Sequence, residues 1–194
     1  MDGHMDVLEA LLIAISGLWL FLPAMLPNSA AAVVGGGSPV DRGRSWRGKR
    51  LLGDGKTWRG LVGGAAAGVL LGLIQLGIAF PFDADALWGF GPIWKALGVI
   101  SALAVGSLLG DMLGSFIKRR LDLERGAKLP IMDQYDFVIG AFLLTALFYP
   151  QWVWASYFEG WNILALIFLL IITPILHRGA NMIAYKMGKK DVPW

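Results

Sequence analysis

The sequence predicts an all-α, polytopic membrane protein with five transmembrane helices and a long cytoplasmic loop between the first two. The 194 residues are 56% hydrophobic and only 16% charged, with a mean hydropathy of +0.61. This composition is far more apolar than a soluble domain of this length requires. Five apolar segments are long enough to cross a bilayer, and basic residues gather in alternate loops. We expect residues 1–194 to form a single integral membrane domain.

The expected helices are long apolar segments covering residues 7–25, 61–80, 93–120, 135–154 and 161–185. The first exceeds the core of a signal peptide, and we expect Pro27 to end it. The second is rich in glycine, which permits close packing of membrane helices. Pro174 is expected to kink the fifth. The cytoplasmic loops are then residues 27–59 and 121–134.

The distribution of Lys and Arg predicts the orientation of the chain in the membrane. The segment before the first helix has no basic residue, whereas the loop at 27–59 has seven. The next loop carries Asp83 and Asp85 and the one after the fourth helix only Glu159, and both are rich in the aromatic residues typical of headgroup level. The third-to-fourth turn and the C-terminal part are again basic, through Lys118, Arg119, Arg120, Arg125 and Lys128, and through Arg178, Lys186, Lys189 and Lys190. We therefore expect the N-terminus outside and the C-terminus in the cytoplasm, in the cell membrane.

Three carboxylates meet where the third helix ends and the fourth begins. Asp111 lies inside an apolar helix, and Asp133 and Asp136 share a face at the start of the next apolar segment. Asp133 alone could cap its helix, and Asp111 could pair with a nearby cation. Because charge at membrane depth is costly and hard oxygens are the ligands that Mg²⁺ prefers, the three together predict a magnesium site. The chain has no cysteine, which excludes disulfides and thiolate metal sites.

Ser115, Lys118 and Arg119 follow Asp111 at helical spacing and share its face. The two cations could be anchors that reach the headgroups from the helix end, a role that suits Arg120. Their position beside Asp111 instead favours contact with phosphate.

The loop at 27–59 is too long for a mere connector in a compact bundle. Its Gly35–Gly37 run allows backbone amides to approach a ligand, and donors that suit phosphate are Lys56, Thr57 and Arg59. The other arginines suit an ordinary positive-inside loop. Asn28 and Ser29 could touch substrate or could simply follow a helix ended by Pro27.

Two other sequence motifs of nucleotide-binding or nucleotide-transferring proteins do not match this loop. Gly53-Asp54-Gly55-Lys56-Thr57 is not a triphosphatase loop, because Arg50 stands where the pattern needs glycine. The Asp-Gly-x-x-Ala-Arg signature of CDP-alcohol phosphotransferases is matched only in part, and its two further aspartates are missing.

The spaced motifs together resemble those of a known family. Gly110-Asp111-x-x-x-Ser115-x-x-Lys118-Arg119 followed by Asp133-x-x-Asp136 is similar to the signature of phosphatidate cytidylyltransferases, and closer still to that of the archaeal CDP-archaeol synthases. Further matches are Asn28-Ser29, Gly35–Gly37 with Pro39 and Asp41, the run from Gly53 to Gly60, and Asp133-Gln134-Tyr135-Asp136-Phe137. The Pro-Gly-His-Gly-Gly stretch of the bacterial signature is absent, which argues against phosphatidate as the substrate.

This resemblance implies transfer of CMP from CTP to 2,3-bis-O-geranylgeranyl-sn-glycerol 1-phosphate, giving CDP-archaeol and pyrophosphate. It implies one or two Mg²⁺ ions held by Asp111, Asp133 and Asp136, with Lys118 and Arg119 in catalysis. The residues implied in binding CTP or the ether-lipid phosphate are Asn28, Ser29, Gly36, Gly37, Asp41, Lys56, Thr57, Arg59 and Ser115. A nucleic-acid partner is not expected, and a homodimer stays open.

Two other classes remain as alternatives. A small transporter would need polar residues through the membrane midplane, where only Asp111 is a candidate. A non-catalytic scaffold that binds anionic lipid would explain the arginines but not the three aspartates. Magnesium-dependent binding of CTP would separate the enzyme from both.

Overall fold

The computed structural model describes residues 5–82, 88–123, 127 and 129–188. Asp83, Asp85, Arg125, Lys128, Lys189 and Lys190 of the orientation argument lie outside these residues. Within the described part, five helices are long and apolar enough to cross a membrane, namely α1 (Val7–Val34), α2 (Trp58–Ala79), α3 (Ile93–Arg120), α4 (Pro130–Phe148) and α6 (Ile163–Lys186). The predicted five-helix membrane fold is therefore confirmed.

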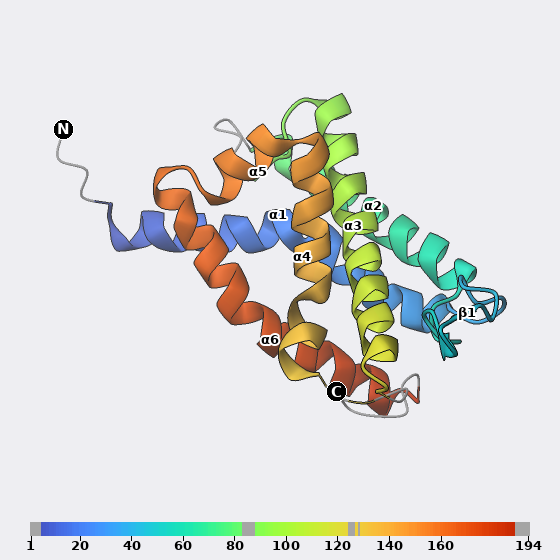
Figure 1. Cartoon of the computed structure of the whole chain (residues 1–194). Helices are drawn as coiled ribbons and strands as arrows, with labels where there is room; N and C mark the ends of the chain where they lie inside the picture. The colour runs from blue at the N-terminus through green and yellow to red at the C-terminus, as the bar shows by residue number, and fades with distance from the viewer. Residues whose placement is uncertain (1–4, 83–87, 124–126, 128, 189–194) are drawn as a thin grey trace.

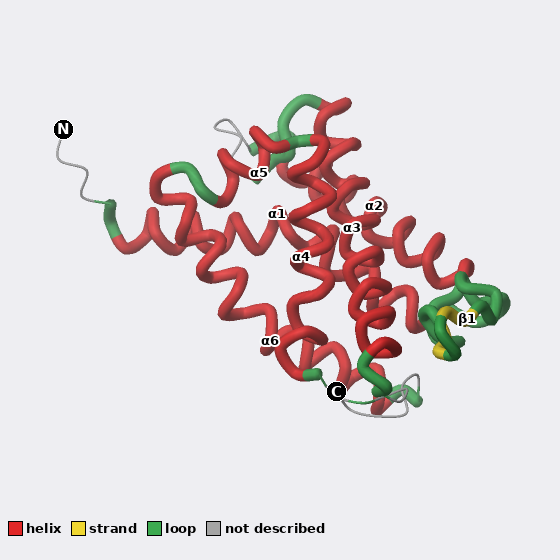
Figure 2. Tube along the Cα trace, viewed as in Figure 1, coloured by secondary structure: helices red, strands yellow, loops and turns green. Residues whose placement is uncertain are grey.

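α3 lies at the centre of the bundle, in contact with α1, α2 and α4 (Figure 1). Two short helices, α5 (Pro150–Tyr157) and η1 (Gly160–Asn162), connect α4 to α6. The strands β1 (Ser45–Trp46) and β2 (Lys49–Arg50) form a small antiparallel hairpin near the ends of α1 and α2 (Figure 2). Its turn at Arg47 and Gly48 has φ values of +52° and +77°, as a type I′ turn requires.

Pro27 does not end the first helix, contrary to the prediction, because α1 continues to Val34. A proline has no N–H, so the carbonyl of Pro23 loses its helical donor. α2 packs closely over this region, since a Cβ on Gly68 would lie 2.6 Å from the oxygen of Pro23. Membrane helices tolerate proline where neighbouring segments cover the freed backbone. Asn28 consequently lies within α1 and not in a loop after it.

The fourth predicted helix, at 135–154, is in fact two helices. α4 begins earlier, because Pro130 suits a first helical turn and the side chain of Asp133 accepts the N–H of Leu129 at 3.0 Å. It ends at Phe148, because Pro150 forces Tyr149 out of the helical conformation, to φ −134° and ψ 54°. Asp133 and Asp136 therefore belong to the first two turns of α4.

α2 begins at Trp58, three residues before its predicted start. The hydroxyl of Thr57 accepts the N–H of Gly60 at 3.1 Å and caps the helix. The segment between α1 and α2 is thus residues 35–57, and it places Lys56 next to the helix start.

Candidate active site

Glycine contacts between α3 and α4 set the position of Asp136. A Cβ on Gly110 would lie 2.1 Å from the backbone oxygen of Asp136, and one on Gly114 would lie 2.2 Å from its Oδ2. The two helices are therefore in backbone contact, and no larger residue fits at either glycine without movement. Because Gly114 lies one turn after Asp111 on α3, this contact brings the carboxylate of Asp136 close to that of Asp111.

Two ion pairs complete the cluster. Lys56 pairs with Asp111, and Lys118 pairs with Asp133. All four side chains are half-buried, between 18% and 29% exposed. Asp136 forms no ion pair with any described residue. It does interact electrostatically with Asp111, Lys56 and Asp133. Three carboxylates and two ammonium groups thus form one group, which we call the aspartate–lysine cluster.

Asp133 has two partners, which bears on both interpretations of this residue. Its Oδ2 accepts the N–H of Leu129 at the start of α4, and its Oδ1 pairs with Lys118. Lys118 also donates to the carbonyl of Ala127 at 3.1 Å. Asp133 is therefore not the N-cap of α4, which is Leu129, but it accepts the N–H of that residue and belongs to the cluster as well.

The other predicted site residues differ in burial and in their contacts. The Oδ1 of Asn28 and the Nε of Arg119 are buried and have no hydrogen-bond partner within the described structure. Ser115 is half-buried on α3, and Thr57 is the buried cap of α2. Arg59 is exposed and lines a separate surface hollow with Val34 and Val62. Three predicted residues are exposed, and within the described residues no side-chain contact joins them to the cluster. They are Ser29, Gly36 and Gly37.

Asp41 organises the loop. Its side chain is 1% exposed and accepts backbone N–H bonds from Gly43, Leu52 and Gly53 at 3.0–3.1 Å, together with the guanidinium of Arg50 at 2.9 Å. Burial raises the pKa of Asp41, but the hydrogen bonds from Arg50 and the backbone outweigh burial and hold the pKa well below its usual range. The predicted contact with substrate stays a prediction, and the observed bonds are structural.

Replacing Asp41 with Asn should loosen the segment at 35–57, because an amide NH₂ cannot accept the N–H bonds that one carboxylate oxygen now receives. We expect trypsin to cut at Arg42, Arg44 or Arg47 about ten-fold faster, since losing such bonds costs about 1–3 kcal/mol. A depressed pKa means that this stabilisation is complete above about pH 4 and is lost in acid, so digestion at pH 7 reports all of it. Equal digestion of Asp41→Asn and of the exposed control Asp54→Asn would contradict this role.

Arg120 holds the hairpin, a role that the sequence did not indicate. Its guanidinium donates to the carbonyls of Trp46, Lys49 and Arg50 at 2.6–3.0 Å and lies over the rings of Trp46 and Phe116. No sequence pattern distinguishes such a residue from an anchor at a helix end, because its partners lie about 70 positions away. The end of α3 thereby carries both the cluster and the loop that supplies Lys56.

The carboxylates fit magnesium by chemistry, since all three offer hard oxygen donors. In the part of the chain that the structure describes, no group of three or more His, Cys, Asp or Glu is close enough to hold a metal ion as the side chains stand. As they stand, Asp111 and Asp133 are each engaged by a lysine. Release of the two lysines would free both carboxylates for a cation.

Comparisons with known proteins cover nearly the whole chain. The family model described as CarS-like: CDP-archaeol synthase matches residues 8–194. The CDP-archaeol synthases of Methanospirillum hungatei and Methanosphaerula palustris are 49% and 51% identical over 174 residues, which is 89% of this chain and 99% of each relative. That of Halobacterium salinarum is 45% identical over 190 residues, 98% of this chain and all of the relative. A solved structure of an intramembrane enzyme for archaeal membrane lipids biosynthesis is 37% identical, with a TM-score of 0.61 over 91% of this chain and 94% of that one.

Proposed function

The chain belongs to the CDP-archaeol synthase family, and from that premise we propose how its residues carry out the reaction. The enzyme synthesises CDP-archaeol by transferring CMP from CTP to the phosphate of 2,3-bis-O-geranylgeranyl-sn-glycerol 1-phosphate, with release of pyrophosphate. The observation that supports the site is the aspartate–lysine cluster at one end of α3 and α4.

The reaction needs alignment and charge neutralisation more than a protein nucleophile. An oxygen of the lipid phosphate attacks the α-phosphorus of CTP, and the bond from that phosphorus to the β-phosphate oxygen breaks. The leaving pyrophosphate takes the electron pair, so negative charge grows on the β-phosphate. The lipid phosphate is already an anionic nucleophile at neutral pH, and no general base is required to activate it.

Lys56 and Lys118 are placed to neutralise the triphosphate and the leaving pyrophosphate. Each now balances one carboxylate in a half-buried site, where an unpaired charge would be costly. When substrate binds, the two ammonium groups turn to phosphate oxygens, and Asp111, Asp133 and Asp136 are free to hold one or two Mg²⁺ ions. Such ions would supply further charge neutralisation and orientation of the phosphates. Arg119 adds a guanidinium whose Nε has no partner in the described structure.

We place the enzyme in the cell membrane with its N-terminus outside and the cluster on the cytoplasmic side. This orientation follows the positive-inside rule and lets soluble CTP meet a lipid whose chains stay in the bilayer. The partners are CTP and the ether-lipid phosphate, with no nucleic acid, and the proposal works for a monomer or a homodimer.

Purified protein in detergent should transfer radiolabel from CTP to an ether-lipid phosphate in the presence of Mg²⁺, moving label into the organic phase. Phosphatidic acid assayed in parallel should be a poorer acceptor. EDTA should reduce transfer to background, and added Mg²⁺ should restore it. Absence of transfer from protein that still unfolds cooperatively would favour the scaffold alternative, and transfer that resists EDTA would contradict the magnesium assignment alone.

A further inference from the structure

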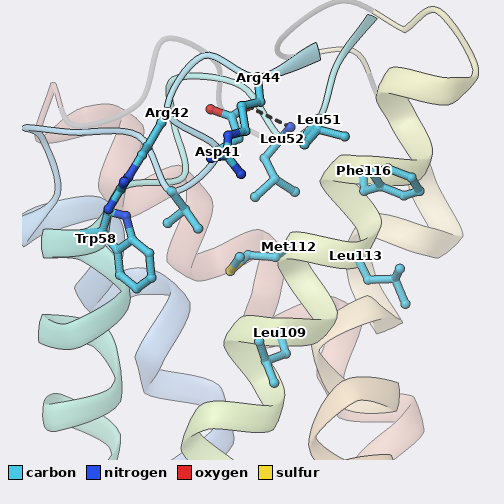
Figure 3. Close-up of a pocket in the computed structure, with 11 residues that line it drawn as sticks. Asp41, Arg42, Arg44, Leu51, Leu52, Trp58, Leu109, Met112, Leu113 and Phe116 are labelled. Carbon is cyan, nitrogen blue, oxygen red and sulfur yellow. Dashed lines mark hydrogen bonds between the residues drawn. The ribbon is translucent and has the colours of Figure 1, made fainter. Parts of the chain in front are cut away.

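An apolar groove lies between the last turns of α3, the first residue of α2 and the loop that joins α1 to α2 (Figure 3). Its volume is about 640 Å³. The floor is formed by one face of α3, through Leu109, Met112, Leu113 and Phe116. Leu109 and Leu113 are 44% and 56% exposed, so this floor faces the hydrocarbon of the bilayer.

The groove is separate from the aspartate–lysine cluster. Leu109 and Asp111 are two residues apart, which places them about 200° from each other around the helix axis. α2 also packs against α3 about one turn before Asp111, since a Cβ on Gly64 would lie 3.2 Å from the side chain of Leu108. A molecule in the groove therefore lies on a different face of α3 from the reacting groups.

The rim of the groove is cationic. Arg42 and Arg44 line it from the loop, are exposed, and form no ion pair with any described residue. Asp41 also lines the groove, but it does not neutralise these two arginines. Its carboxylate is bonded to Arg50 and to backbone N–H groups of the loop. Two free guanidinium groups thus stand above an apolar floor at the membrane surface.

We propose that the groove binds an anionic bilayer lipid that does not react. Its phosphate contacts Arg42 and Arg44, and its chains lie along Leu109 and Leu113. Guanidinium groups suit phosphate, and basic residues at this depth attract anionic lipid. A lipid held there fastens the loop to α3, and this loop delivers Lys56 to Asp111. The inference rests on the proposed function only for the cytoplasmic position of the loop.

Native mass spectrometry of the whole chain, extracted from vesicles of phosphatidylglycerol and phosphatidylcholine in equal amounts, tests the proposal. The wild type should retain phosphatidylglycerol selectively. Arg42→Gln/Arg44→Gln should retain it at least about ten-fold less, because two basic contacts are lost. Leu113→Trp, which fills the floor and keeps the charge, should also lose it.

The matched control is Arg47→Gln, which removes a basic residue of the same loop that does not line the groove. Retention that is equal in wild type and the double variant, or that falls as far in the control, would overturn the proposal. So would a raised KM for the ether-lipid phosphate with retention unchanged, since the groove would then hold the substrate. Stabilisation of the wild type by Mg²⁺ and CTP is read separately by thermal unfolding, so that failure of the proposed function is distinguishable from failure of the lipid site.

Discussion

Asp111→Asn should lower kcat for CDP-archaeol synthesis by about 10²–10³-fold or more, the range found when one charge-stabilising group is removed from an active site. Asparagine has nearly the size of aspartate, so the packing of α3 should survive. The change replaces one of the three carboxylates of the proposed magnesium site with a neutral amide and leaves Lys56 without its carboxylate. Single-turnover transfer from CTP would measure the loss, and thermal unfolding would report that the protein remains folded.

A matched control lies just beyond the end of the same helix. Asp122→Asn removes the same charge, but Asp122 is 73% exposed and pairs with Lys49 at the surface. Its kcat should stay within about three-fold of the wild type, since exposed pairs contribute little. Asp111→Asn turning over as fast as Asp122→Asn would remove Asp111 from the site.

The same comparison extends to the other two aspartates. Asn at position 133 can still accept the N–H of Leu129, so Asp133→Asn separates the charge of this residue from its hydrogen bond to the start of α4. Full turnover in all three Asn variants, at positions 111, 133 and 136, would overturn the magnesium assignment as a whole.

Local spacing explains which part of the site could be predicted. Asp111, Ser115 and Lys118 share a helical face by their separation alone, and so do Asp133 and Asp136. The partner of Asp111 could not be found in this way, because Lys56 lies 55 residues earlier and reaches the cluster through a folded loop. Contacts between helices depend on packing that one-dimensional periodicity does not encode.

Asp41 and Arg120 show that sequence alone also cannot distinguish a structural charged residue from one that contacts a ligand. A charged residue in a basic loop has the same sequence signal whether it faces a ligand or the loop itself. The folded structure decides between these two roles. Here the carboxylate of Asp41 is buried and accepts the backbone N–H groups of Gly43, Leu52 and Gly53. Proline was misleading for a related reason, since Pro27 would end a helix in water, but it is accommodated here because α2 packs against the backbone it frees.

Gly110→Ala is the second change with a large expected effect. A methyl group there would lie 2.1 Å from the backbone oxygen of Asp136 and 3.0 Å from the Cα of Gly140, and neither atom can move without its helix. Overpacking of this kind costs about 1–3 kcal/mol, equivalent to a fall of about 5 °C in Tm for a chain of this size. Moving α4 also displaces the carboxylate of Asp136, and a shift of about 1 Å in an active site can cost 10²-fold in rate.

Two further glycine substitutions separate the stability effect from the positioning effect. Gly77→Ala adds the same methyl group to an exposed site on α2 with nothing within 4 Å, so turnover should match the wild type. Its Tm should not fall and should rise slightly, because alanine favours the helix over glycine by about 1 kcal/mol. The three atoms nearest a Cβ on Gly114 all belong to the side chain of Asp136, whose carboxylate can rotate away, so Gly114→Ala should lower turnover more than it lowers Tm. Thermal unfolding in detergent with and without Mg²⁺ and CTP gives both readings. If Gly110→Ala melted and turned over like Gly77→Ala, the contact between α3 and α4 would not be what positions Asp136, and the cluster would need another support.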